Sequence, residues 1–352
     1  MLTHTQRERE RGDKSIKISC FDFFRAIACF CVLFQHFFEL HPHEIGLVNS
    51  KLILVFCYAS LSMFFFTTGY LIPLSLERCN WKQFAVKRIF RLLPVLWFAV
   101  FIVVGYYLIT GNIQQYHTMN LKNILSTMFI QTDVVSLFTF PPQRIKVFHN
   151  ILLTTSWSMQ VEIKFYIFFA LLFTLFRSNK KKIINILSIF AILMLLIGFI
   201  YPNARGFSNF SGCWMKVLVV EFGTLIYYYQ KKEISKKYVI LFSLIASPIA
   251  INFNYPYIQY IGYMLGYLIC IYFVLKKPTF GNNKFVKFFA NISYSMYLLH
   301  YLCLYQTFTD NEHYIRYFFI CYALLVPICY LIYRFIEKPC YDFGRRLASK
   351  IK

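Results

Sequence analysis

Apolar runs of about 20 residues recur along the whole chain, and short segments rich in Lys and Arg separate them. An α-helix needs about this many apolar residues to cross the hydrocarbon core of a bilayer. Hydrophobic residues make up 58% of the 352 residues and charged residues only 15%, against about 25% charged residues in soluble domains. This pattern predicts an all-α polytopic membrane protein, in which each helix satisfies its own backbone hydrogen bonds.

We predict one ten-helix membrane domain over residues 20–333, between an N-terminal tail over 1–19 and a basic C-terminal tail over 334–352. The predicted spans are 20–40, 52–75, 92–110, 157–176, 183–201, 212–229, 238–253, 257–275, 288–307 and 314–333. The longest connection, 111–156, holds an apolar run broken by Gln131 and Asp133. We expect an interfacial or re-entrant piece there rather than another span.

The distribution of cations between alternate connections predicts the orientation in the membrane. With the N-terminus inside, 28 of the 37 Lys and Arg lie in inner segments and seven in outer segments, and only Arg25 and Lys164 lie within spans. The positive-inside rule therefore places both termini in the cytoplasm. Because the net charge of +22 is spread over these connections and not over one soluble face, we expect a lipid bilayer and no nucleic acid as partner.

Ionisable residues within spans are costly, so each is a functional candidate. Arg25 and His36 are 11 residues apart, close to three helical turns, and so share one helix face about 16 Å apart. The first is a fixed cation near the inner side and the second a proton acceptor near the outer side. Two structural alternatives stay open: an Arg25–Asp22 ion pair, and a His36 that only packs between helices.

A carboxylate enters from the outer side at a matching depth. In "TTSWSMQVEIKFY", Glu162 lies about 7 Å along the span, at the level predicted for His36. The acid could orient the imidazole and stabilise its cation. Trp157 has an alternative role as an aromatic residue of the membrane interface.

Two further motifs carry polar candidates. "NISYSMYLLH" places Tyr294 and Tyr297 on one helix face and brings His300 into the outer half of its span. "VKRIFRLLP" places Arg88 and Arg91 three residues apart, with Pro94 expected to open a helix. This arginine pair could clamp phosphate groups, or it could merely follow the positive-inside rule. For Glu221, near the middle of a span, we predict no role beyond pairing.

Together these residues suit a group-transfer enzyme. A phosphorylated cytosolic donor would dock on the inner cations, and His36 would deprotonate a hydroxyl from the outer side. No serine or cysteine nucleophile is evident beside a base, so direct transfer is simpler than a covalent acyl-enzyme. The eleven cysteines form no CxxC or Cys/His cluster, and we expect no metal.

Six motifs resemble, in order, those of the acyltransferase-3 family of bacterial integral-membrane O-acyltransferases. They cover most of the chain, with Thr68 in place of that family's serine. The motifs are Arg25 to His36, "FFFTTGY", Arg88 to Pro94, "WSMQVEIKFY" with Trp157, Ser158, Glu162, Phe165 and Tyr166 in register, Tyr294 to His300, and "IEKP" at 336–339.

The resemblance implies transfer of an acyl group, usually acetyl from acetyl-CoA, to a hydroxyl of a surface glycan or its lipid-linked precursor. It implies that His36 is the catalytic base, that Arg25 holds or polarises the acyl group, and that Arg88 and Arg91 face the CoA phosphates. With Glu162 as the acid beside His36, these make the predicted catalytic residues His36, Arg25 and Glu162. Trp157, Ser158, Tyr166, Tyr294, Tyr297 and His300 would line the acceptor path.

The implied location is the bacterial cytoplasmic membrane. No bound cofactor is expected, because the acyl-CoA is a co-substrate. Glycan-assembly proteins are expected partners, since some family members finish the transfer with a fused extracytoplasmic domain. Two alternatives remain: an acyltransferase for a small molecule or lipid head group, and a proton-coupled exporter or flippase. The exporter hypothesis predicts two inverted halves with paired broken helices, and the sequence shows no such symmetry.

Overall fold

The computed structural model describes residues 19–40, 47–110, 121–128, 153, 157–200, 208–251, 257–306 and 314–351. All regular secondary structure in these residues is helical, which confirms the all-α class. Three of the described helices are long and apolar enough to cross a membrane, over Lys51–Arg78, Trp81–Ile109 and Phe318–Lys350. The number of spans and the side of each terminus stay predictions.

Each predicted span overlaps one described helix. The helices are α2 (Cys20–Leu40), α3 (Leu47–Arg78), α4 (Trp81–Thr110), α5 (Leu121–Met128), α7 (Trp157–Phe176), α8 (Lys180–Ile200), α9 (Ser208–Gln230), α10 (Lys236–Ile251), α11 (Tyr257–Lys276), α12 (Lys284–Gln306), α13 (Tyr314–Ile332), the π-helix η3 (Tyr333–Glu337) and α14 (Lys338–Lys350). Of the connection 111–156, only α5 and Leu153 lie within the described residues before α7, so the predicted interfacial piece is largely outside them. The N-terminal tail lies outside them as well, up to residue 18.

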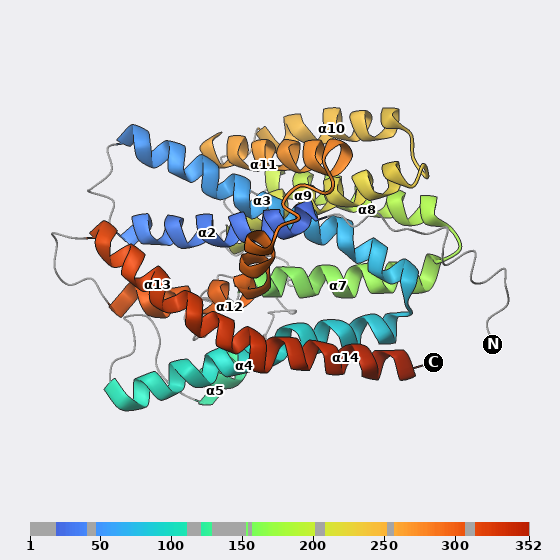
Figure 1. Cartoon of the computed structure of the whole chain (residues 1–352). Helices are drawn as coiled ribbons and strands as arrows, with labels where there is room; N and C mark the ends of the chain where they lie inside the picture. Colours follow the sequence, from blue (N-terminus) through green and yellow to red (C-terminus); the bar gives the residue numbers. More distant parts are fainter. Residues whose placement is uncertain are drawn as a thin grey trace.

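The short turns that follow α3, α7 and α9 all lie at one end of the bundle, at the right of Figure 1. The C-terminal end of α14 lies at the same end. These turns coincide with the basic segments of the sequence. The chain therefore gathers these cations at one end, and we refer to it as the basic end of the bundle.

The prediction that Pro94 opens a helix is wrong, because α4 begins at Trp81 and Pro94 lies inside it. A capping box explains the earlier start. The Gln83 backbone N–H donates to Oδ1 of Asn80 (2.8 Å), and the Asn80 backbone N–H donates to Oε1 of Gln83 (3.2 Å). With its first turn satisfied in this way, α4 extends through Arg88 and Arg91 before it reaches the proline.

Residues 334–350, which the sequence presents as a basic tail, are helical and continue α13 through η3 into α14. α14 packs along α4. A Cβ at Gly344 would overlap the side chain of Phe90, so the glycine permits this close approach. The amide of Gln83 also donates to the Ile351 carbonyl (2.8 Å), which ties the end of the chain to the start of α4.

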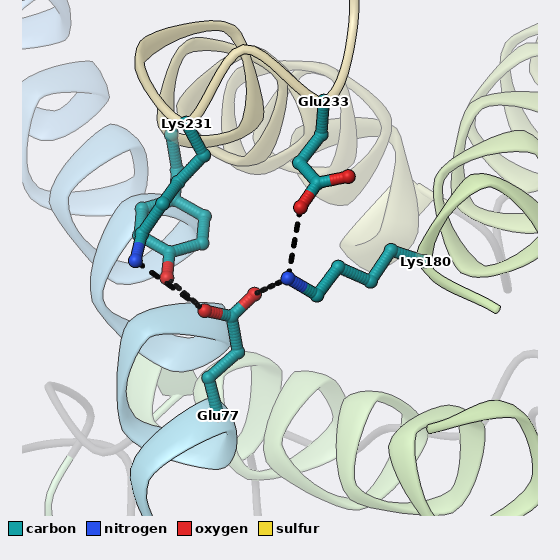
Figure 2. A network of polar contacts seen from close by, with 5 residues as sticks. Glu77, Lys180, Lys231 and Glu233 are labelled. Atoms are coloured by element: carbon teal, nitrogen blue, oxygen red, sulfur yellow. Dashed lines mark hydrogen bonds and ion pairs between the residues drawn. The ribbon is translucent and has the colours of Figure 1, made fainter. Parts of the chain in front are cut away.

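An ion-pair network joins α3 and α8 to the turn after α9 at the basic end (Figure 2). Lys180 lies 2.9 Å from Glu233 and 3.7 Å from Glu77, and Lys231 lies 3.8 Å from Glu77. The hydroxyl of Tyr227 donates to the same Glu77 carboxylate (2.7 Å). The hydrogen bond to Glu233 and the nearby Glu77 charge raise the pKa of Lys180, which lies just outside the predicted span.

Small residues set the packing of α3 against α9 and α11. A Cβ at Gly69 would overlap the Val220 carbonyl oxygen of α9, and a Cβ at Gly223 would overlap the Phe66 carbonyl oxygen of α3. A Cβ at Gly266 of α11 would likewise overlap the Ala59 carbonyl oxygen. Helices in membranes approach this closely where glycines face the partner backbone. The glycine of "FFFTTGY" is thus a packing residue.

We predict that Gly69→Ala lowers the thermal stability of the purified protein, because the added methyl group must push α3 away from α9 at a cost of about 1–3 kcal/mol. A thiol-reactive dye can follow unfolding, since Cys57 and Cys270 among others are buried. Gly105→Ala is the matched control, because a Cβ there meets nothing within 4 Å among the described residues. Equal melting temperatures for Gly69→Ala and wild type would show that this contact does not hold the helices together.

Candidate active site

A cavity of about 70 Å³ lies between α2, α3, α4, α7 and α12. By volume it accommodates a few water molecules. Apolar side chains such as Val32, Leu61 and Phe64 form much of its wall. The polar residues that face it are Arg25, Arg91, Ser158, Glu162, Ser293, Tyr294 and Tyr297. The structure thus brings together, around one space, predicted site residues that are up to 272 positions apart, from Arg25 to Tyr297.

Arg25 projects from α2 toward α12. Its guanidinium donates to the Ser293 hydroxyl oxygen (3.4 Å), and that hydroxyl in turn donates to the Ala290 carbonyl (2.8 Å). Cys29, one turn further along α2, donates to the Ser293 carbonyl (3.4 Å). No Asp22–Arg25 ion pair occurs in the described part of the chain. The alternative in which Asp22 neutralises Arg25 is therefore not what the geometry shows.

Arg88 and Arg91 of α4 face different spaces. Arg91 lines the cavity, and no carboxylate oxygen lies within 4.0 Å of it among the described residues. Arg88 instead lies against the rings of Phe84 and Tyr166, on a groove between α4 and α7. Three residues turn a helix by about 300°, so the two side chains leave α4 in directions about 60° apart. This angle lets the two guanidinium groups reach separate compartments. The predicted phosphate clamp is therefore divided between two sites.

Glu162 lies on the α7 wall of the cavity and accepts a hydrogen bond from the Tyr166 hydroxyl one turn away. The Tyr166 oxygen lies 3.4 Å from Arg88, which donates to it. No hydrogen bond or ion pair between Glu162 and His36 occurs among the described residues, so the structure does not form the predicted acid–base pair. These contacts form a chain of hydrogen bonds from Arg88 through Tyr166 to Glu162.

His36 lies one helical turn beyond Val32, the outermost cavity-lining residue of α2. Its ring stacks on that of His300, with centroids 5.3 Å apart and planes inclined by 19°. His300 is buried, and its Nδ1 lies 2.8 Å from the Tyr297 carbonyl, which can only accept a hydrogen bond. The ring of Tyr297, which lines the cavity, lies 5.9 Å from that of His300. The two imidazoles therefore stand near the end of the cavity away from Arg25.

The remaining predicted path residues are also placed. Ser158 is buried and faces the cavity, while the side chain of Trp157 lies outside the described residues. The Tyr294 hydroxyl donates to the Leu92 carbonyl (2.9 Å) and lies 3.3 Å from the Met159 sulfur. Tyr294 thereby holds α12 against α4 and α7 beside the cavity.

The sequence analysis missed Glu337 as a site residue. This carboxylate lies on η3, is only 7% exposed, and accepts a hydrogen bond from Ser295 (3.3 Å). The positive charges of Arg25 and Arg91 attract the negative charge of this carboxylate. The "IEKP" motif contains Glu337, but its place among basic residues after the last predicted span favoured a solvated tail. A single π-helical turn, frequent at functional sites, re-aims this side chain inward, and no sequence period announces it.

Glu221 lies elsewhere, between α8 and α9, where the Ser188 hydroxyl donates to it (2.7 Å). This contact agrees with the pairing role that the sequence suggested. In the described part of the chain, no group of three or more His, Cys, Asp and Glu side chains could hold a metal ion.

The charge balance of the cavity lining is positive. Arg25 and Arg91 line it together with one carboxylate, Glu162. The carboxylates of Glu337 and Asp22 also act on Arg25 from outside the lining. Cations in an apolar bundle attract negative charge strongly, because little water screens them. Such an arrangement can hold an anion or stabilise an oxyanion that forms during a reaction.

Comparison with known families gives one match: the model described as an acyltransferase domain matches residues 18–334, nearly the whole chain. No curated protein and no solved structure matches the chain. The matched range includes every residue that lines the cavity.

We predict that Glu337→Gln lowers thermal stability by about 1–3 kcal/mol, because it leaves Arg25 and Arg91 without one of their compensating charges. The thiol-dye melting assay measures this change. Asp342→Asn is the matched control, since it removes the same charge from α14 outside the cavity. If both variants melt at the wild-type temperature, Glu337 does not balance the arginines.

Proposed function

We propose that this chain, which belongs to the acyltransferase-3 family, transfers an acyl group from cytosolic acyl-CoA to a hydroxyl of a surface glycan or its lipid-linked precursor. The family supports membrane acyltransferase activity, and acetyl is the acyl group that we propose. The proposed location is the bacterial cytoplasmic membrane. No bound cofactor is required, because the acyl-CoA is consumed as a substrate.

One observation carries the proposal: Arg25 and Arg91 face a small, largely apolar cavity that also holds Glu162. A volume of about 70 Å³ suits an acyl group of a few heavy atoms better than a long chain. The guanidinium groups supply donors where the carbonyl oxygen of an acyl group would gain negative charge. Arg91 lines the cavity whereas Arg88 faces a separate groove, so Arg91 is the better placed of the α4 arginines to receive the donor.

The proposed reaction is direct transfer in a ternary complex. The acceptor hydroxyl attacks the thioester carbonyl carbon, His36 takes the hydroxyl proton, and Arg25 and Arg91 stabilise the tetrahedral oxyanion. Collapse of this intermediate breaks the carbon–sulfur bond, and the proton held by His36 leaves with the CoA thiolate as CoA thiol. The products are the acyl ester and CoA.

The position of His36 supports the acceptor side of this scheme. Because His36 stands one turn beyond Val32 and stacks on His300, the acceptor hydroxyl would meet the acyl group at this end of the cavity. Ser158, Tyr294, Tyr297 and His300 would line its path, with Tyr166 beside Glu162. Trp157 stays a predicted residue of this path. The carboxylate of Glu162 would keep the side chains of Arg25 and Arg91 in position through its negative charge.

We predict that His36→Ala reduces transfer by about 10²–10⁴-fold, the usual contribution of a general base. Proteoliposomes receive radiolabelled acetyl-CoA and extracted surface glycan, and the label in the glycan is counted. Cys31→Ala is the control, since it lies on the same helix but not on the cavity. Undiminished transfer by His36→Ala would overturn the base assignment, and glycan that crosses the bilayer without label would favour an exporter.

A further inference from the structure

A groove of about 720 Å³ runs between α4 and α7 in the half of the bundle nearest the basic end. Apolar side chains form most of its walls. Ile89, Ile167 and Leu171 are between 48% and 64% exposed at its edges, on helices expected to face lipid. We call this space the α4–α7 groove.

One cation stands in this apolar groove. The Arg88 guanidinium lies 5.0 Å from the ring centroid of Phe84 and 4.7 Å from that of Tyr166. No carboxylate lies within ion-pair distance of it in the described residues. A guanidinium has five N–H donors. Arg88 uses one of them in its hydrogen bond to the Tyr166 hydroxyl, so donors remain for another acceptor. A guanidinium in this setting favours a bidentate anion such as phosphate.

The depth of Arg88 limits what kind of molecule can supply that anion. Trp81 begins α4 at the basic end and lines the groove, and Arg88 lies about 10 Å further along the helix axis. The edges of the groove between these positions are apolar and exposed. A ligand that fills the groove therefore needs a phosphate to meet Arg88 and a hydrocarbon part to cover these walls.

The groove also adjoins the catalytic cavity. Leu92 lines both spaces, and the Tyr166 hydroxyl that accepts from Arg88 donates to Glu162 in the cavity. A phosphate on Arg88 would thus lie one side chain away from the site of transfer. What is attached to that phosphate could reach the cavity while the hydrocarbon chain stays in the bilayer.

We propose that the α4–α7 groove is a lateral entry site for a lipid phosphate, which binds Arg88 through its phosphate and leaves its hydrocarbon chain between Ile89 and Ile167. This assignment rests on the proposed function and narrows it, since it makes the acceptor a lipid-linked molecule. It also divides the two arginines of α4: Arg91 serves the acyl donor and Arg88 serves the lipid phosphate.

Trp81 provides a direct reporter, because it lines the groove and is one of four tryptophans in the chain. Trp97, Trp157 and Trp214 are changed to Phe, and the protein is placed in vesicles that contain brominated lipids, which quench nearby tryptophan. Brominated phosphatidic acid, with a phosphate head, is compared with brominated phosphatidylcholine of the same chains. We expect half-quenching at an about tenfold lower mole fraction of phosphatidic acid.

Variants of Arg88 test the role of its charge and fork. Arg88→Gln should abolish the preference for phosphatidic acid, whereas Arg88→Lys should keep part of it, since a lysine retains the charge without the fork. Lys87→Gln, which removes a neighbouring cation outside the groove, should leave the preference intact. If Arg88→Gln does not fold, the reduced preference of Arg88→Lys relative to Lys87→Gln remains the test.

Three results would overturn the proposal: equal quenching by both lipids, a preference that survives Arg88→Gln, or recovery of Trp81 fluorescence when CoA is added. The last would assign the groove to the donor. Because quenching requires no turnover, selective quenching together with no acyl transfer by the wild-type chain would refute the proposed function alone. Transfer without selective quenching would refute only the lipid site.

Discussion

Arginine charge held inside an apolar helix bundle is the feature on which the site depends. Placing a cation there costs several kcal/mol unless other groups compensate it. Partial compensation comes from one hydrogen bond of Arg25 to Ser293 and from the aromatic faces around Arg88. The carboxylates of Glu337, Asp22 and Glu162 also compensate Arg25. The remaining positive charge can hold an anion or stabilise a developing oxyanion, and little water is present to screen it.

The parts that hold the bundle together lie apart from these charges. Gly69, Gly223 and Gly266 allow α3 to approach α9 and α11 closely, and the Glu77–Lys180 network closes the basic end. The cavity instead lies where α2, α4, α7 and α12 surround the other side of α3. One side of α3 is thus closely packed, and the other side borders the cavity and its polar side chains.

Helix class and much of the site were predictable because spacing on a helix determines which side chains share a face. The separation of Arg25 from His36 indicated one face of α2, and the cavity and the His36–His300 stack lie along it. Contacts between helices were not predictable in this way. Periodicity cannot show that Arg25 bonds to Ser293 of α12, or that Arg88 and Arg91 face separate spaces. The Glu162–Tyr166 pair and the Asn80–Gln83 capping box are local patterns that the sequence does contain and that the prediction overlooked. Glu337 was missed because a π-turn, not an α-helical period, directs it inward.

The central claim is that acyl transfer takes place in the cavity lined by Arg25, Arg91 and Glu162. The most direct test uses an acyl-CoA whose short acyl group carries a diazirine, with the labelled residues identified by mass spectrometry after irradiation. Our account predicts labelling of Cys29, Met159 or Tyr297, which line the cavity, and its loss when excess acetyl-CoA competes. Competable labelling confined to α8, α9 and α10, around Glu221, would contradict it.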